Sequence, residues 1–597
     1  MDVTKFKKSL KDLSSKDLKT LIFLLYLHIL QASYVGIMMT LSPKLLGSSN
    51  VRYAGHASLT LIYYPFITKI IWGPFIDTYY VKAIGRRKCW LLLSSFLLGV
   101  WLVYHSSEID NYMETRNIPI LIKIFMIASI ILTIQDIALE GWWITCIDRK
   151  KNGLVSIVLE TGNIIGHFTG YTLVIVVSSK SYSNYIRSFL SLSFQNYPIF
   201  TIGQSVKLMG ALFIISCTII TVFMTENSDN IPSDDMFNKV EGKIKLMSIL
   251  KILWRLIKSK LFKKYAKFLI LILICPGITE PVIRLKLIEA GVTEETSAII
   301  TSLTAPLQII GVVYISRYCV MDRPLDLYKM IYIPLIVMNL VLTMVYYKTC
   351  MIKNDWINIH GYIFLKEKNS QRQGQGAVFP LYWYFVIACL YCIFIILKQS
   401  LLTSIIAYNI KIADVTISST MLALLAAVGN IVKTFSATFG LYFADKLLGN
   451  KFDCISKNGI RLKEVSNNST NLLIPWTPTL CDKVEGFTVQ TLDNSYIQVI
   501  LVSFFGLFVY TFIDKTADTL SNANYKDWEV DFRGIFDDEI FDHIEQENKI
   551  QLAVYDRIEL DRVDEMITSP PPYAPDYNQN VSNADLKILR NGIIPNK

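Results

Sequence analysis

Apolar stretches recur along this 597-residue chain, and many are long enough to cross a lipid bilayer. A transmembrane helix needs about 20 consecutive apolar residues. The mean hydropathy of the chain is +0.39, and 18% of its residues are charged, against about 25% in soluble domains. These values exclude an ordinary soluble enzyme, and 32 Tyr and 31 Phe exclude a disordered scaffold. The sequence therefore predicts a polytopic membrane protein.

We predict an all-α fold with twelve transmembrane helices in a six-plus-six arrangement. The first six apolar segments are 20–40, 57–78, 89–105, 119–139, 155–177 and 205–224, and the second six are 266–288, 296–316, 327–347, 379–409, 417–443 and 496–514. This order predicts a basic N-terminus (1–19), a first half (20–224), a basic central loop (225–265), a second half (266–514) and an acidic tail (515–597). Two six-helix halves around a central site are the arrangement of the major facilitator superfamily.

The Lys and Arg residues of short loops predict the orientation, because they accumulate on the cytosolic side. Basic residues gather in connections 82–88, 148–151 and 239–267, whereas 41–56 and 106–118 carry few. We therefore expect both termini in the cytosol. Most of the ten Cys lie inside apolar segments, where a buried thiol is expected, so no metal and no cofactor are predicted. Nothing in the chain indicates binding of nucleic acid.

Two regions outside the predicted helices carry motifs. The loop 444–495, assigned to the lumenal side, holds overlapping glycosylation sequons at Asn467 and Asn468. It also contains Cys454 and Cys481, which are candidates for a disulfide. From Asp518 onward the chain has 17 acidic and 8 basic residues, and it includes a PPxY motif formed by Pro570, Pro571 and Tyr573. Such a motif is a ligand for WW domains, which predicts a WW-domain ubiquitin ligase as a partner, while an ordinary Pro-rich linker is the alternative.

Ionisable side chains inside the predicted spans are the candidate substrate-binding residues, because a charge at membrane depth is costly. Four cations fall there, namely Lys69, Arg284, Lys398 and Lys433, and two amides, Gln308 and Asn430, lie in the second half. A cation cluster matches a phosphate-bearing or multiply acidic cargo. Alternatively, each cation pairs with an acid inside the bundle, such as Glu160 or Glu280.

A second set of residues is predicted to gate or couple transport, namely Asp77, Arg86, Arg87, Asp136, Glu140 and Glu160. Asp77 followed by Gly85-Arg86-Arg87 resembles the signature between helices 2 and 3 of the major facilitator superfamily, although the spacing here is longer. In that signature the acid and the arginines latch neighbouring helices. Asp136 and Glu140 are four residues apart and share a helix face, which predicts ion pairs with basic partners or a proton site.

Two segments carry residues that shape the backbone. Gly162, Gly166 and Gly170 recur every fourth residue, which predicts close helix packing more than ligand binding. Segment 266–288 contains Pro276 and Pro281, which interrupt the helical hydrogen-bond ladder. In the same segment Glu280 and Arg284 are four residues apart, and this spacing predicts a local salt bridge.

Several of these stretches together resemble the acetyl-coenzyme A transporters of the endoplasmic reticulum membrane. The resemblance is carried by Tyr64-Pro65-Phe66 through Asp77, Tyr80-Val81-Lys82, Gly85-Arg86-Arg87-Lys88-Cys89-Trp90, Gln135-Asp136-Ile137-Ala138 with Gly141-Trp142, Leu285-Lys286-Leu287-Ile288-Glu289 and Ala305-Pro306-Leu307-Gln308. It extends over about residues 15–515 and does not include the acidic tail.

The resemblance implies a carrier that moves acetyl-CoA from the cytosol to the lumen of the endoplasmic reticulum and supplies lumenal acetylation. It implies that Lys69 contacts an anion of the cargo, that Asp77, Arg86 and Arg87 form the latch, and that Asp136 and Glu140 tune or drive it. Oxidised glutathione, another large anion, is an alternative cargo. A polytopic acyltransferase using His28 or His167, a proton-coupled carrier of small solutes and a receptor or scaffold are the alternative classes.

Overall fold

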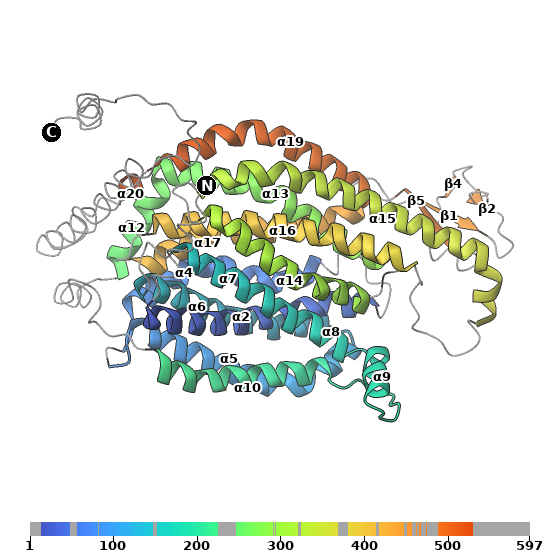
Figure 1. Cartoon of the computed structure of the whole chain (residues 1–597), viewed down its shortest axis with the longest axis horizontal. Coiled ribbons are helices and arrows are strands. Elements are labelled where there is room, and N and C mark those ends of the chain that lie inside the picture. The colour runs from blue at the N-terminus through green and yellow to red at the C-terminus, as the bar shows by residue number, and fades with distance from the viewer. Residues whose placement is uncertain are drawn as a thin grey trace, which may run out of the picture. The chain divides into compact units, whose positions relative to one another are not determined.

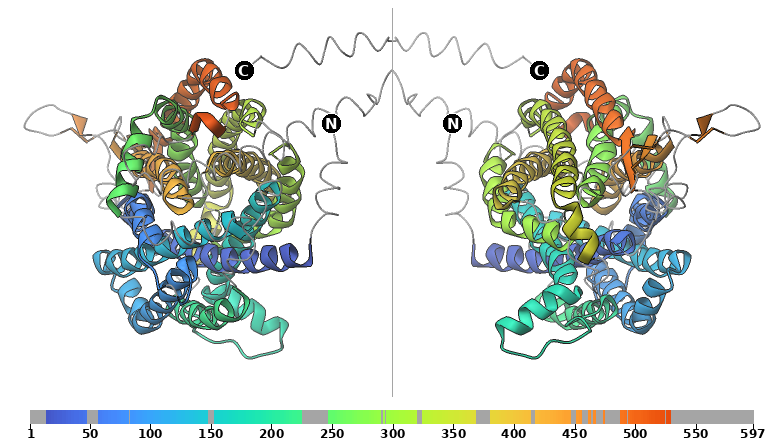
Figure 2. Two further views of the ribbon diagram at one scale, coloured as in Figure 1. Left: turned by 90° about the vertical axis from the view of Figure 1, so that its left-hand side faces the viewer. Right: turned by 90° about the vertical axis from the view of Figure 1, so that its right-hand side faces the viewer.

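A computed structural model provides the structure of the chain. It describes residues 14–47, 57–81, 83–146, 152–224, 246–289, 292, 294–319, 324–367, 380–413, 417–446, 494–523 and 525–528, together with short strands between 451 and 492. The fold is a bundle of long helices that run alongside one another (Figure 1). Viewed along the bundle, the helices of the first part (blue to teal) gather on one side and the later helices (green to red) on the other (Figure 2).

Helices make up nearly all of the described chain. In the first part they are α2 (Ser15–Gly47), η1 (Thr60–Thr68), α4 (Lys69–Thr78), α5 (Arg86–Glu114), α6 (Ile118–Cys146), α7 (Asn152–His167), η3 (Phe168–Leu173), α8 (Val174–Val177), α9 (Lys180–Phe189) and α10 (Ile202–Phe223). In the second part they are α12 (Leu246–Lys258), α13 (Lys260–Glu289), α14 (Glu294–Cys319), α15 (Asp326–Glu367), α16 (Leu381–Ile412), α17 (Ser418–Lys446), α19 (Asn494–Ser521) and α20 (Tyr525–Trp528).

Ten helices in the described part of the chain are long and apolar enough to cross a membrane. The predicted all-α polytopic class is therefore confirmed. Each of the twelve predicted segments lies on a helix, but 155–177 and 296–316 are not among the ten. Segment 155–177 carries polar residues such as Glu160, which lower its mean hydropathy, and the side chains of 296–316 are only partly described. The count of twelve spans remains a prediction.

The structure also contains regular elements where the sequence predicted only connections. Helix α12 lies within the central loop 225–265, α13 begins at Lys260, and α9 follows the fifth segment. Strands β1 (Lys451–Ile455), β2 (Arg461–Leu462), β3 (Val465–Ser466), β4 (Leu473–Ile474) and β5 (Phe487–Leu492) lie in the predicted loop 444–495. They form an antiparallel sheet of order β2-β1-β5 and a β3-β4 pair.

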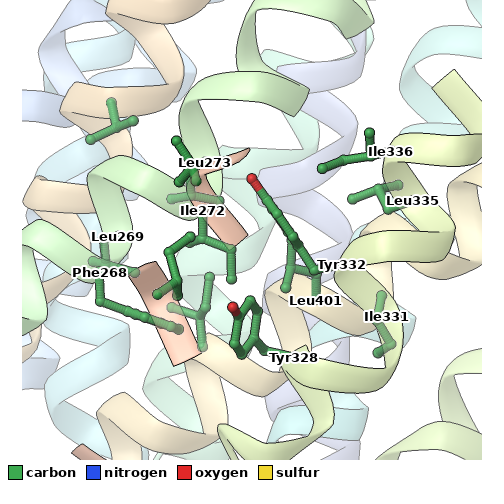
Figure 3. Close-up of a cluster of buried hydrophobic side chains, with 14 of the residues drawn as sticks. Phe268, Leu269, Ile272, Leu273, Tyr328, Ile331, Tyr332, Leu335, Ile336 and Leu401 are labelled. Atoms are coloured by element: carbon green, nitrogen blue, oxygen red, sulfur yellow. The ribbon is translucent and has the colours of Figure 1, made fainter. Parts of the chain in front are cut away.

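Buried apolar side chains form separate clusters in the two parts of the bundle. The largest lies mostly among α13, α15, α16, α17 and α19, where Phe268 packs against Tyr328 with ring centroids 5.4 Å apart (Figure 3). Another cluster gathers residues of α2, α5, α6 and α10. A further cluster joins Ile76 and Trp142 of the first part to Leu422 and Ala423 of α17. The bundle therefore has a core in each part and an apolar junction between them.

Irregular backbone occurs in two helices of the first part. Nine residues of η1, with Pro65 inside, form a 3-10 helix, which is long because such runs rarely exceed three or four residues. The π-helical turn η3 continues α7. A Cβ added to Gly162, Gly166 or Gly170 would meet atoms of α2, including the Cβ of His28 at 2.8 Å from Gly162. These glycines therefore lie where α7 and η3 pack closely on α2.

Candidate functional site

A cavity of about 730 Å³ lies between the two parts of the bundle. Small-molecule sites typically enclose about 300–1,000 Å³. Its lining comes from α2, η1, α4, α6, α7 and η3 of the first part and from α13, α14, α16 and α17 of the second. Within the described residues, α5, α10, α15 and α19 contribute nothing to this lining. These four helices correspond to the third and sixth predicted segments of each half, so the same segments of both halves line the cavity.

One group of charges on the cavity wall is joined by ion pairs to a single lysine, and we name it the Lys69 cluster (Lys69, Asp136 and Glu140). The Nζ of Lys69 lies 2.6 Å from Asp136 Oδ2 and 3.0 Å from Glu140 Oε1. Lys69 begins α4 and is 3% exposed, while both carboxylates project from α6. The predicted pairing of these acids with a basic partner is therefore present, and that partner is the lysine expected to meet a cargo.

A second group carries more positive than negative charge, and we name it the Lys433 cluster (Arg284, Lys398, Lys433, Glu160 and Glu280). The carboxylate of Glu280 accepts from Lys398 Nζ at 2.5 Å, across from α13 to α16. The predicted salt bridge between Glu280 and Arg284 is wrong, because Glu280 pairs with Lys398 on the facing helix instead. The Arg284 guanidinium instead lies over the ring of Tyr171, 5.8 Å from its centroid.

Lys433 is the least engaged cation on the cavity wall. It is an exposed side chain that lines the cavity from α17, and it interacts electrostatically with Glu160 and Glu280. Among the described residues, no hydrogen bond or ion pair within 4.0 Å reaches its ammonium group. Glu160 is 1% exposed, and its carboxylate accepts a hydrogen bond from Gln399 of α16. Three cations and two carboxylates therefore leave a formal surplus of one positive charge.

The two predicted amides also line this cavity. Gln308 donates to Thr304 Oγ1 at 2.8 Å on its own helix α14. Asn430 donates to the carbonyl oxygen of Phe66 at 3.3 Å and so links α17 to η1. Aromatic rings and apolar side chains occupy much of the remaining lining. A cavity with apolar walls and a few placed charges can hold a ligand that has both an anionic and an apolar part.

A separate ionic network closes one end of the bundle, and we name it the latch (Asp77, Arg86, Arg87, Ser418 and Thr420). Asp77 Oδ1 lies 2.8 Å from Arg86 Nη2 and 3.5 Å from Arg87 Nη2. Its other oxygen accepts from the backbone N and the Oγ1 of Thr420, at 2.9 and 2.7 Å. Arg87 also donates to Ser418 Oγ at 3.0 Å. The carboxylate thus joins the predicted arginines to the start of α17, some 340 residues away in the chain.

The sequence predicted the acid and the arginines of this network but not their partners on α17. Thr420 and Ser418 are uncharged residues at the start of an apolar segment, and no local pattern marks them. Gln399 was likewise not assigned a role. His28 was named only as a candidate base; it lines the cavity, is 8% exposed, and lies beside Gly162. Only the packing of distant helices identifies Thr420, Ser418 and Gln399.

The remaining sequence predictions concern residues outside the described part of the chain. Asn467, Asn468, Cys481, Pro570, Pro571 and Tyr573 all lie there, and Cys454 is described only as part of β1. The glycosylation sites, the disulfide and the WW-domain ligand therefore remain predictions.

Comparison with known proteins gives a family match over most of the chain. A family model described as Acetyl-coenzyme A transporter 1 matches residues 20–530. An uncharacterised protein of Schizosaccharomyces pombe is 25% identical over 331 residues, which are 53% of this chain and 58% of that protein. An uncharacterised membrane protein of Saccharomyces cerevisiae is 24% identical over 357 residues, covering 52% and 62%. The chain spans about three fifths of the length of these two relatives.

Solved structures of membrane transporters show a weaker likeness. The proton:xylose symporter XylE, of the major facilitator superfamily, gives a TM-score of 0.43 at 11% identity, covering 83% of this chain and 95% of that one. A bacterial homologue of the iron transporter ferroportin gives 0.39 at 11% identity, covering 84% and 100%. With TM-scores below 0.5, neither likeness supports an inference about the cargo or mechanism of this chain.

Proposed function

Because this chain belongs to the acetyl-coenzyme A transporter family, we propose that it carries acetyl-CoA across the endoplasmic reticulum membrane, from cytosol to lumen. The family match and the helical bundle make it a multi-pass membrane transporter. The cargo, the organelle and the direction belong to the proposal, as does the supply of acetyl groups to lumenal acetylation. We further propose that both termini lie in the cytosol and that the chain is a carrier rather than an enzyme.

The observation that carries this proposal is the Lys433 cluster on the wall of the cavity between the two parts of the bundle, where three cations exceed two carboxylates by one. Acetyl-CoA has a pyrophosphate and a ribose phosphate, and Arg and Lys are the usual protein partners of phosphate groups. We place these phosphates at Lys433 and Arg284. Among the described residues, Lys433 has no ion pair to break, and Arg284 lies over an aromatic ring and interacts electrostatically with Glu280. The apolar lining then accommodates the pantetheine arm and the acetyl group.

Alternating access provides the mechanism by which the cargo crosses the bilayer. In such carriers two halves rock around a central site. The latch joins the first part to α17 at one end of the bundle, and a buried apolar cluster packs there as well. Opening that end therefore requires separating Asp77 from Thr420 and Arg87 from Ser418. We propose that cargo binding at the Lys433 cluster helps to offset this loss when the bundle changes state.

The Lys69 cluster receives a different role in this proposal. Lys69 is buried and already holds two carboxylates, so a cargo anion would have to displace both. Breaking a buried ion pair without replacement is costly. We propose that the Lys69 cluster keeps α4 and α6 together and tunes the transition, and that the cargo anion meets Lys433 first.

Uptake of labelled acetyl-CoA into proteoliposomes that contain the purified protein tests the proposal. We expect saturable uptake that CoA competes and that glutathione disulfide does not. Uptake of labelled glutathione disulfide without acetyl-CoA would overturn the cargo while leaving the cation site in place. Release of CoA from acetyl-CoA by protein in detergent, with the acetyl group transferred to an added amine or hydroxyl acceptor, would instead indicate an acyltransferase.

Substitutions in the same assay separate a binding residue from a folding residue. Lys433→Met should abolish competition by CoA at concentrations that saturate the wild-type protein. Lys207→Met is the matched control, because Lys207 is an exposed lysine on α10, outside the cavity lining. Equal uptake by Lys433→Met and the wild-type protein would show that the cargo does not bind at this cavity.

A further inference from the structure

Helix α12 lies within the connection that the sequence assigned to a loop, and its two faces differ sharply. Successive residues of an α-helix are about 100° apart around its axis. Ile249, Ile252, Leu253 and Leu256 share one face and are all buried, and α12 packs through it on α13 and α4. The helix is therefore fixed to the bundle by an apolar stripe, and its opposite face is left outside.

The outer face of α12 carries two adjacent strips of side chains. Met247, Leu250 and Trp254 form an apolar strip, with Trp254 60% exposed and Met247 63% exposed. Lys251, Arg255 and Lys258 form a basic strip beside it, all exposed. The ammonium group of Lys258 lies over the Trp254 ring, 4.8 Å from its centroid, so the two strips meet there. The start of α13 extends the basic strip with Lys260, Lys263, Lys264 and Lys267.

The direction of α12 sets this outer face at the surface of the bilayer. In Figure 1 α12 lies across one end of the bundle, whereas the long apolar helices run along its length. A helix that crosses the ends of membrane-spanning helices lies parallel to the membrane plane. It joins α13, a spanning helix, after a single residue, Ser259, so it cannot lie far from the interface. Trp is enriched at this depth, where the membrane meets water.

We propose that the outer face of α12 and the basic start of α13 form a binding surface for anionic phospholipid headgroups. The apolar strip inserts Trp254, Met247 and Leu250 into the upper acyl region, and the basic strip pairs with lipid phosphates. An interfacial helix with Lys and Arg beside Trp and Leu has the composition that anionic membranes attract. The helix α12 also packs on α4, which carries the latch residue Asp77 in its last turn. Lipid binding to α12 is therefore coupled to the latch through the contact between α12 and α4. This surface depends on the membrane location of the chain and not on its cargo.

Native mass spectrometry of the purified full-length protein tests the surface directly. Protein in detergent is mixed with equal amounts of phosphatidylserine and phosphatidylcholine, and the ratio of retained lipids is measured. We expect the wild-type protein to retain phosphatidylserine preferentially and Lys251→Glu/Lys258→Glu to lower the ratio at least threefold. Lys180→Glu/Lys207→Glu is the matched control, because it reverses two exposed lysines on α9 and α10 and should leave the ratio unchanged.

Three outcomes would overturn the proposal. The first is an unchanged ratio of retained phosphatidylserine to phosphatidylcholine in the Lys251→Glu/Lys258→Glu variant, provided that the variant elutes as a single species in gel filtration. The second is an equal fall in the control, which would indicate a general effect of charge. The third is crosslinking of α12 to the acidic segment after residue 531 with no preference for phosphatidylserine, which would assign the surface to that segment. Acetyl-CoA uptake is measured separately, so failure of the lipid surface leaves the cargo proposal untouched.

Discussion

The Lys69 cluster and the Lys433 cluster line the same cavity with the same kinds of side chain, and they differ in whether their lysine is ion-paired. Lys69 lies between two carboxylates and is 3% exposed. In the Lys433 cluster Glu280 forms an ion pair with Lys398, and Glu160 accepts a hydrogen bond from an amide. Lys433 has no ion pair among the described residues. A matched, buried charge stabilises the fold, whereas an unmatched charge in a cavity is available to a ligand. Residue type alone does not separate these two uses.

The largest effect is expected from Lys69→Met. This substitution leaves Asp136 and Glu140 near each other without a cation, and breaking a buried pair in this way costs about 3–5 kcal/mol. We expect a marked fall in melting temperature and in the yield of monodisperse protein, measured by thermal unfolding in detergent. The triple variant with Asp136→Asn and Glu140→Gln should recover most of the loss. An unchanged melting temperature in Lys69→Met would erase the distinction between the two clusters.

The latch is a second matched network, and Asp77→Asn tests it. The substitution weakens the hydrogen bonds of this carboxylate with Arg86 and Thr420 and its ion pair with Arg87, and each charged hydrogen bond contributes about 1.5–3 kcal/mol. We expect the closed end of the bundle to open more often. Labelling of Ser418→Cys, in a background without other cysteines, should therefore be several-fold faster when Asp77 is Asn. Asp518→Asn, which removes an exposed partner of Lys329, is the control and should not alter the labelling rate.

Lys433→Met tests the second cluster, where we expect an effect on cargo binding and not on stability. Because Lys433 has no ion pair to lose, the melting temperature should remain close to that of the wild-type protein. The apparent affinity for the cargo should fall about 10–100-fold, which corresponds to about 1.4–2.7 kcal/mol. Measurement of KM in the uptake assay, beside the melting curve, separates the two effects. A large loss of stability with no change in KM would make Lys433 a structural residue like Lys69.

The smallest effect is expected from Glu280→Gln, and its sign is opposite. Neutralising this carboxylate releases Lys398 and raises the positive charge of the Lys433 cluster by one. A partly exposed ion pair contributes up to about 1 kcal/mol, so an anionic cargo should bind up to about fivefold more tightly. The KM for acetyl-CoA should fall and its salt dependence should increase. Weaker binding would indicate that Glu280 contacts the cargo or orients Lys398 toward it.

Much of the site was predicted from sequence because burial of charge in a bilayer is rare enough to be noticed. Lys69, Lys433 and Asp136 stand out in apolar segments without any knowledge of their partners. The pairing was predictable only where both members share a helix face or a short connection, as for Asp77 with Arg86. The wrong salt bridge shows the limit of this reasoning. Glu280 and Arg284 are suitably spaced along one helix, but Lys398 on a facing helix lies nearer to the carboxylate.

Helix α12 shows a different limit. Its apolar residues recur at helical spacing, but the segment is short, carries many lysines, and lies in a connection that the charge bias assigned to the cytosol. A search for bilayer-spanning segments therefore passes over it. Its amphipathic period was present in the sequence, and a helical analysis of the central loop would have predicted it. Its contact with α4 required the structure.

The sequence by itself determined that this chain is a polytopic helical membrane protein, because bilayer thickness sets the length and composition of a spanning segment. It also determined the family, through motifs that are dense in order and spacing. Only the tertiary structure decided which charges are paired and which face a cavity. Ion pairing depends on distances of a few ångströms between helices that are remote in the chain, and one-dimensional spacing does not specify those distances. Lys69 and Lys433 are alike in the sequence, and the packing of α6 against α4 makes them different.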